Sequence, residues 1–202
     1  MKIALIGASG NAGSRILKEL SDRGHAVTAI ARNVDRIATL PGVTPVSGDV
    51  NAPDALAEAL RGHDAVVLSL PFAPNDPATL IELVRVSGVK RYMVVGGAGS
   101  LEIAPGQRLI DQPGFPEEYK TEARAGAIFL DRLREVEDLE WTFLSPSAMF
   151  VPGERTGRFR LGTDTLLSNE QGSSISFEDY AMALVDEIEQ PRHIRRRFTV
   201  GY

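Results

Sequence analysis

Short apolar runs alternate with amphipathic segments along the first half of the chain. Segment 2–6 is apolar after its first residue and ends in glycines, as does a strand buried on both faces of a parallel sheet. Ile16, Leu17 and Leu20 then fall on one face of a predicted helix, and Gly24 suits its end. The alternation recurs, with strands predicted at 26–30, 43–50, 65–68 and 92–95 and helices predicted at 33–40, 53–62 and 76–88.

This repetition of strand and helix indicates the fold class. Each repeat is about 20–30 residues long, enough for a right-handed crossover that places consecutive strands parallel in one sheet. We therefore predict a doubly wound α/β fold, mostly parallel with helices on both faces, of the Rossmann type. Pro45 in the third strand indicates a sheet edge. Such sheets bind ligands at the carboxyl ends of their strands.

The regular pattern ends at residues 97–117, which are rich in Gly and Pro. A loop of this length is functional, partly structured or a sign that its elements are wrongly assigned. Beyond it we predict small C-terminal elaborations of the sheet. We expect a helix over 118–136, strands at 141–144 and 198–200, short strands around 158–160, and a helix capped by Ser176 with Asp179 in the capping-box position.

Composition and charge exclude several classes of protein. The 202 residues, 43% hydrophobic and 24% charged, suit a single globular domain spanning 1–202. A net charge of −5 argues against nucleic-acid binding. No apolar run approaches the roughly 18–20 residues that cross a bilayer, and the apolar N-terminal stretch is too short for a signal peptide. We expect a cytoplasmic protein without a membrane partner, and leave open whether it forms a homo-oligomer.

The absence of cysteine excludes disulfides, thiolate metal sites and a cysteine nucleophile. We predict no metal site.

The turn after the first strand carries the strongest motif. It reads Gly7-Ala8-Ser9-Gly10-Asn11-Ala12-Gly13 and opens the first predicted helix. Glycines there let the backbone approach a pyrophosphate, whose charge then lies at the helix N-terminus. The plainer alternative is a tight strand-to-helix turn with no ligand. The motif, its position and the repeated pattern agree on a dinucleotide site.

Arg32 bears on the choice of dinucleotide. It follows the second strand nineteen residues after Gly13, where an acidic residue would bind the ribose hydroxyl of NAD. A guanidinium at this place favours the 2′-phosphate of NADP. The alternative is a solvated arginine at the start of the next helix, so NADP is preferred and NAD is left open.

The ends of the next three strands supply further candidate contacts. These are Asp49 and Val50 for the adenine, Ser69, Leu70 and Pro71 for the ribose, and Gly96, Gly97 and Ala98, where the chain can pass close to the cofactor. Asp49 has an equally good alternative role as the cap of the following helix.

These motifs resemble the atypical short-chain dehydrogenase/reductase superfamily, and within it the NADH-flavin reductases related to biliverdin reductase B and to NmrA-like NAD(P)-binding proteins. The resemblance spans nearly the whole chain and is carried by GASGNAG, GGAGSLEIAPGQRLIDQPGFPEEYK, WTFLSPSAMF, GERTGRFRLG and the segment ISFEDYAMALVDEIEQPRHIRRRFTVGY. It implies hydride transfer from a nicotinamide cofactor to a small-molecule acceptor, with FMN or FAD as a candidate substrate.

One departure from the superfamily bears on mechanism. Its reductases use a Tyr-x-x-x-Lys helix to move a proton to or from a carbonyl oxygen. Here Tyr119 is followed directly by Lys120, and position 123 is Ala. This disfavours ketone chemistry, whereas a flavin or quinone needs mainly positioning and exclusion of solvent. Ser100, Tyr119 and Lys120 are the candidate polar contacts of the acceptor, although Tyr119 and Lys120 equally suit a solvated helix start.

The nicotinamide is expected between Ala8–Gly10, Gly97–Ala98 and the segment after the sixth strand, with the 99–118 loop over the acceptor. That segment contributes Pro146, Ser147 and Met149. We therefore predict an NAD(P)H-dependent oxidoreductase with a flavin or quinone acceptor. The alternative is a non-catalytic NADP(H) sensor of the NmrA-like type.

Overall fold

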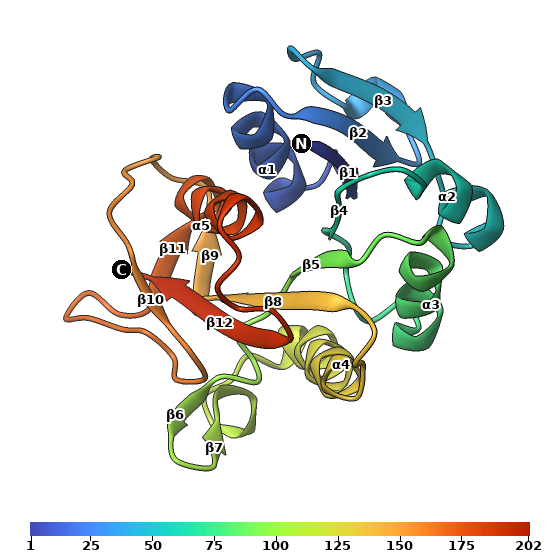
Figure 1. Cartoon of the computed structure of the whole chain (residues 1–202). Coiled ribbons are helices and arrows are strands. Elements are labelled where there is room, and N and C mark those ends of the chain that lie inside the picture. Colours follow the sequence, from blue (N-terminus) through green and yellow to red (C-terminus); the bar gives the residue numbers. More distant parts are fainter.

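The computed structural model describes residues 1–202, and its centre is an eight-stranded sheet (Figure 1). The strand order is β10-β12-β8-β5-β4-β1-β2-β3, and every neighbouring pair is parallel except β10 and β12. The strands are β1 (Lys2–Ile6), β2 (Ala26–Ala31), β3 (Val43–Ser47), β4 (Ala65–Leu68), β5 (Arg91–Val95), β8 (Glu140–Pro146), β10 (Arg160–Gly162) and β12 (Arg196–Gly201).

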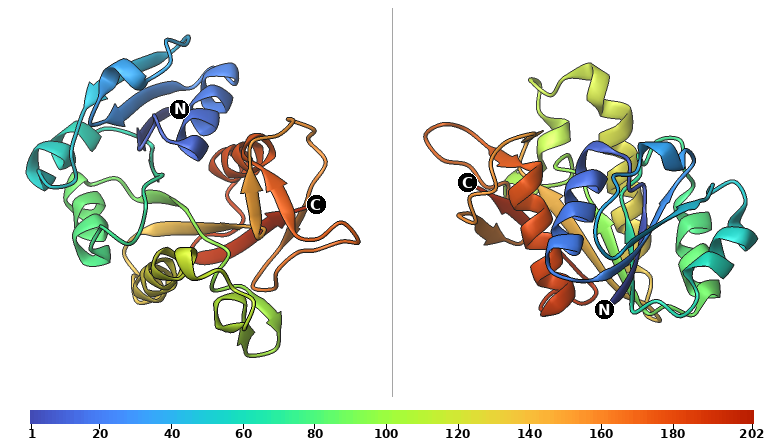
Figure 2. Two further views of the ribbon diagram at one scale, coloured as in Figure 1. Left: turned by 180° about the vertical axis from the view of Figure 1, so that it is seen from behind. Right: turned by 90° about the horizontal axis from the view of Figure 1, so that it is seen from above.

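Helices cover both faces of the sheet, which confirms the predicted doubly wound class (Figures 1 and 2). Helices α1 (Asn11–Asp22) and α5 (Phe177–Glu189) pack on one face. The other face carries α2 (Pro53–Leu60), α3 (Pro77–Ser87) and α4 (Glu117–Arg134). No helix combines the length and the apolar character needed to cross a membrane.

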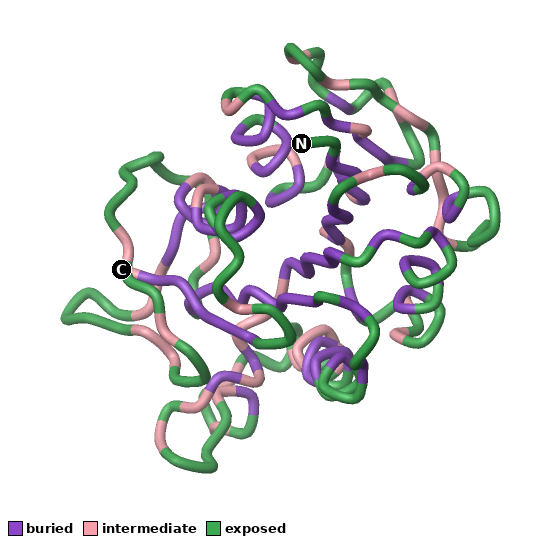
Figure 3. The backbone as a smooth tube through the Cα atoms, in the orientation of Figure 1, coloured by how far each residue is buried: buried purple, intermediate pink, exposed green.

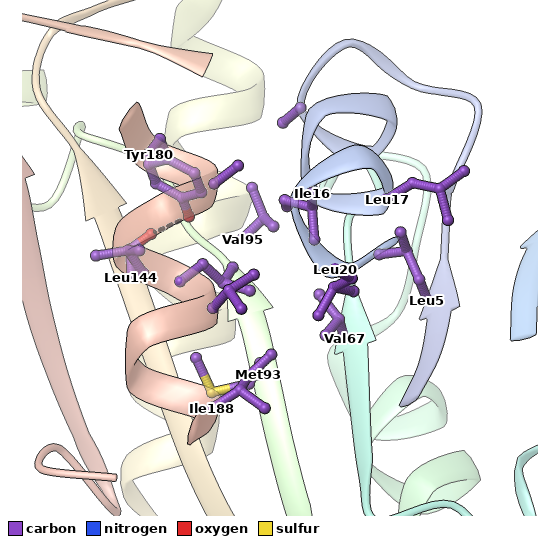
Figure 4. Close-up of a cluster of buried hydrophobic side chains, with 14 of the residues drawn as sticks. Leu5, Ile16, Leu17, Leu20, Val67, Met93, Val95, Leu144, Tyr180 and Ile188 are labelled. Carbon is purple, nitrogen blue, oxygen red and sulfur yellow. Dashed lines mark hydrogen bonds between the residues drawn. The ribbon is translucent and has the colours of Figure 1, made fainter. Parts of the chain in front are cut away.

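Each central strand sends successive side chains to opposite faces. Ile3 and Leu5 of β1 enter the cluster under α1 and α5, whereas Ala4 and Ile6 enter the cluster under α2, α3 and α4. Tyr180 of α5 belongs to the first cluster and donates a hydrogen bond to the Leu144 carbonyl at 2.7 Å (Figure 4). Both faces of these central strands are apolar, so the strands lack polar alternation. Strands β4 and β5 are buried along their whole length, whereas the edge strand β3 is not (Figure 3).

The sheet reverses its order at β1. From β1 the chain moves outward through α1 to β2 and β3, then returns through α2 to β4 on the other side of β1. The turn after β1 therefore lies between two diverging connections, where open α/β sheets bind their ligands. Strand β3 is the sheet edge that Pro45 predicts.

Two local predictions need correction, and a third is made specific. The predicted helix 33–40 is a single 3-10 turn, η1 (Val34–Arg36), because the Asn33 side chain accepts from the Asp35 amide at 3.0 Å and Ile37 is already extended. Strand β3 ends at Ser47 rather than at 50. The 97–117 segment is structured, because Gly106 at φ +73° turns β6 (Glu102–Ala104) back onto β7 (Gln107–Arg108), and η2 (Leu109–Asp111) follows.

The start of α5 holds a buried carboxylate rather than a full capping box. Ser176 caps the helix as predicted and accepts from the Asp179 amide at 2.9 Å. The Asp179 carboxylate turns away and accepts from the amides of Thr156 and Gly157, both at 2.8 Å, and from the Thr156 and Tyr202 hydroxyls. It thereby fixes the loop after β9 (Met149–Val151), which pairs with β11 (Ser174–Ser176).

Replacing Asp179 with Ala should lower the free energy of unfolding by about 3 kcal/mol, because several buried donors lose their acceptor at once. Urea unfolding measures the change. Asp186→Ala on the same helix is the matched control. Asp186 pairs with Arg23 at the surface and is 54% exposed, so its loss should cost less than about 1 kcal/mol. Equal losses would contradict the role given to Asp179.

Candidate functional site

Two adjoining hollows follow the carboxyl ends of the central strands. The narrow hollow has a volume of about 370 Å³ and lies over the ends of β1, β2 and β4 and the chain after β3. The wide hollow has a volume of about 660 Å³ and lies over the ends of β5 and β8, against α4. Both are lined by Ser69 and Leu70, so together they form one continuous cleft.

The narrow hollow is lined by Ile6, Gly7, Ser9, Gly10, Ile30, Ala31, Arg32, Arg36, Gly48, Asp49, Val50, Asn51, Ser69, Leu70, Pro71, Pro74 and Asn75. The wide hollow is lined by Ser69, Leu70, Phe72, Val95–Ser100, Leu109, Gln112, Gly114–Pro116, Tyr119, Glu122, Ala123, Gly126, Ala127 and Pro146–Phe150.

Two glycines of the turn after β1 are required by the fold itself. Gly7 has a φ of +87°, and a Cβ there would lie 2.0 Å from the Ser69 carbonyl oxygen. A Cβ on Gly13 would lie 2.1 Å from the Gly7 carbonyl oxygen. Neither backbone can move aside cheaply, so only glycine fits at these positions.

Two other glycines have no such steric requirement from the protein. A Cβ on Gly10 would meet only the Gly7 carbonyl oxygen, at 3.3 Å, and a Cβ on Gly97 would meet nothing within 4 Å. Both residues line the cleft. Their missing side chains therefore leave open space at the places where a ligand can approach the backbone.

The N-terminus of α1 faces the same turn without a capping side chain. Gly10 is the N-cap, makes no side-chain hydrogen bond, and no acidic residue lies in the first helical turn. The free amides and the helix dipole thus favour an anion at this place. Ala8, Ala12 and Gly13 of the motif are buried beneath the turn, whereas Asn11 is exposed.

Two exposed arginines line the narrow hollow. Arg32 follows β2 as predicted, and the 3-10 turn η1 brings Arg36 beside the same hollow. Neither forms an ion pair in the protein. Arg15, by contrast, pairs with Glu178 at 3.1 Å. Arg36 was not predicted, because its position depends on how the chain turns after Asn33.

The structure excludes one of the two roles weighed for Asp49 and leaves the adenine contact a prediction. Its Oδ1 accepts from the backbone amide and the side-chain amide of Asn51, both at 2.9 Å. Helix α2 has Ala52 as its N-cap and no side-chain cap. Asp49 therefore does not cap the helix, and its second carboxylate oxygen has no hydrogen-bond donor from the protein. Val50 lines the narrow hollow beside it.

The predicted polar contacts of the acceptor do not all reach the wide hollow. Ser100 lines it and accepts a hydrogen bond at 3.1 Å from Arg197, which also pairs with Asp164. Tyr119 lies at the mouth and is 62% exposed. Lys120 lies outside the lining and pairs with Glu117 at 2.6 Å.

Apart from Gln112 and Glu122, the rest of the lining of the wide hollow is apolar or small. Glu122 is its one carboxylate, and it was not predicted from the sequence. Its two oxygens accept from the Phe72 and Ala73 amides at 2.6 and 2.9 Å, which ties α4 to the chain after β4. A link across about fifty residues leaves no signal in the local pattern.

No histidine lines the cleft. The three histidines are hydrogen-bonded elsewhere: His25 to Glu189, His63 to Thr28 and His193 to Glu187. His25 is buried. No group of three or more His, Asp or Glu side chains is arranged to hold a metal ion.

The doubly wound sheet with a glycine turn at its switch point defines a Rossmann-type protein. Residues 7–191 match the NAD(P)H-binding family, and the chain belongs to it. The resemblance read from the motifs is thereby confirmed at the level of an NAD(P)H-binding family.

Several relatives cover this chain almost completely. The protein YwnB of Bacillus subtilis (strain 168) is 43% identical over 211 residues, which span 99% of this chain and 98% of YwnB. A solved structure from Streptococcus pneumoniae TIGR4, named provisionally as an NADH-flavin reductase, has a TM-score of 0.85 and 40% identity and covers 100% of this chain and 99% of that one. The NAD(P)H azoreductase of Xenophilus azovorans is 24% identical over 98% of this chain and 67% of that protein.

The two kinds of glycine should respond differently to alanine. Gly13→Ala should destabilise the fold by about 3 kcal/mol, because its Cβ would overlap the backbone. Gly97→Ala should change stability by less than about 0.5 kcal/mol but raise the dissociation constant of NADPH about tenfold, which is about 1.4 kcal/mol. Urea unfolding and titration calorimetry measure the two effects. Unchanged NADPH binding by Gly97→Ala would contradict the assignment of this surface to the cofactor.

Proposed function

We propose that this protein is an NADPH-dependent oxidoreductase that reduces a planar conjugated acceptor, such as a flavin or a quinone. The observation that carries the proposal is the two-part cleft. Its narrow hollow has unpaired arginines and a free helix N-terminus, and it opens at Ser69 and Leu70 into a wide apolar hollow. One part suits a dinucleotide with its phosphates, and the other suits an aromatic ring system.

We propose one orientation for the cofactor, because the two ends of the cleft differ in charge. The adenosine would occupy the narrow hollow, with Asp49 accepting from the adenine amino group and the pyrophosphate against Gly10. The nicotinamide would then lie at the start of the wide hollow, between Gly97 and the segment after β8. Met149, in that segment, is 60% exposed and free to cover a ring.

Arg32 and Arg36 favour NADPH over NADH. They are exposed, lack carboxylate partners and line the same hollow. Two guanidinium groups can bind one phosphate with several parallel hydrogen bonds, whereas a bare ribose hydroxyl uses little of their charge.

The acceptor chemistry follows from what the wide hollow holds. A bound dihydronicotinamide supplies a hydride, which carries two electrons and one hydrogen, and the acceptor gains its second hydrogen as a proton from water. The protein needs to align two planar systems and exclude solvent around them, and an apolar lining does both. Ser100, whose Oγ already accepts from Arg197, keeps its own hydrogen free for a hydrogen bond to the acceptor.

The relatives support the same class of reaction. The Streptococcus pneumoniae protein named provisionally as an NADH-flavin reductase is 40% identical over the full chain. The Xenophilus azovorans relative is named as an NAD(P)H azoreductase, and an azo dye is also a conjugated acceptor. Ketone reduction is less well supported, because Tyr119 lies at the mouth and Lys120 is paired outside the lining.

Arg32→Ala and Arg36→Ala should each weaken NADPH binding by about 1–3 kcal/mol and leave NADH binding within about twofold, because only NADPH has the 2′-phosphate. Calorimetric titration with both cofactors measures this difference. Arg61→Ala removes a surface arginine that pairs with Glu58 outside the hollow, and so controls for net charge. An equal loss for both cofactors would show that these arginines do not bind the 2′-phosphate.

The purified protein should oxidise NADPH in the presence of riboflavin or menadione, followed as the loss of NADPH absorbance. Without an acceptor, the oxidation should be negligible. Tight NADPH binding with no acceptor-dependent turnover would contradict the enzyme and favour the sensor of the NmrA-like type.

Two variants separate the polar candidates in the same assay. Ser100→Ala should lower kcat about fivefold, the effect of one hydrogen bond of about 1 kcal/mol. Lys120→Met should have no effect if the ion pair with Glu117 is its only role. A loss of activity in the Lys120→Met variant would mean that the start of α4 turns toward the cleft.

A further inference from the structure

The wide hollow has almost no charge. Among its lining residues Glu122 is the one acidic or basic side chain, and both of its oxygens accept from the backbone amides of Phe72 and Ala73. That carboxylate is thus directed into the wall of the hollow and its charge is spread over two amide dipoles. No lysine or arginine lines the hollow.

Three cations that are close in the chain to lining residues, or in contact with them, are already paired. Arg197 donates a hydrogen bond to Ser100 and forms an ion pair with Asp164. Its side chain is 4% exposed. Arg108 pairs with Asp111 at 2.8 Å, and Lys120 pairs with Glu117 at 2.6 Å. The lining itself therefore offers no counter-charge to an anionic ligand.

The mouth of the hollow is apolar rather than cationic. Tyr119 and Met149 are 62% and 60% exposed, and both line it. Exposed apolar side chains at a cleft mouth favour contact with an apolar ligand. The narrow hollow is the opposite, since Arg32 and Arg36 have no protein partner there. The charge that can bind phosphate is therefore confined to one end of the cleft.

An anionic acceptor would bind the wide hollow poorly. Its charged group would lose water without gaining a paired cation, which opposes binding. The net charge of −5 adds a weaker, long-range repulsion.

We propose, on the basis of the function proposed above, that the acceptor is an uncharged planar aromatic molecule, a quinone or a flavin without a phosphate. A phosphate on the acceptor hinders binding in the wide hollow. The site discriminates by charge and not by ring structure.

Riboflavin and FMN test this proposal, because they share one isoalloxazine ring and differ in a single phosphate. With NADPH saturating, kcat/KM should be at least about fivefold higher for riboflavin, and the difference should lie mainly in KM. Equal values, or a preference for FMN, would overturn the proposal. Absence of turnover with riboflavin, FMN and menadione alike would instead overturn the proposed oxidoreductase.

A charge variant isolates the cause. Gln112 lines the hollow, and Gln112→Lys adds one cation there, with Gln112→Met as the uncharged control. The riboflavin-to-FMN ratio of kcat/KM should fall several-fold in the lysine variant relative to the methionine variant, and the fall should shrink in high salt. Equal ratios in the two variants would show that charge is not the basis of the preference and would overturn the proposal.

Discussion

The cleft depends on the close approach of two backbones at the switch point of the sheet. The Gly7 backbone lies so near the Ser69 carbonyl that a Cβ would be 2.0 Å from it. This approach lets the chain leave β1, turn and start α1 with its free amides directed at the cleft. The residues after β4 consequently lie beside the glycine turn. Ser69 and Leu70 can then line both hollows and make them one cleft.

The two ends of the cleft have different physical characters because different elements build them. The narrow hollow is formed by strand ends, a helix N-terminus and two arginines, all of which can bind an anion. The wide hollow is formed by α4 and by the chain after β5 and β8, with small and apolar side chains. A dinucleotide that lies across the join would place its phosphates where charge is available and its reactive ring where water is scarce.

The sequence predicted the parts of the site that follow from local pattern. The glycine turn, Arg32 and the strand ends could be predicted from the sequence. Strands and helices alternate regularly along the chain, and a tight turn needs particular residues. Arg36 and Glu122 could not be predicted in this way. The position of Arg36 depends on how the chain turns over several residues, and that of Glu122 depends on a contact with a distant segment. Tyr119 and Lys120 were paired in the prediction, but adjacent helical residues point about 100° apart, so only Tyr119 reaches the hollow.

The construction of the wide hollow from connecting segments has an evolutionary consequence. Residues at strand ends cannot vary without disturbing the sheet. The hairpin of β6 and β7 and the residues around Phe115 are bounded by loops, so they are not constrained in this way. Under the proposed function, substitutions in these segments would alter which oxidant is accepted while the reductant stays the same. Such an arrangement allows a lineage to diversify its substrates rapidly, and it gives an engineer a small, separable set of positions to randomise.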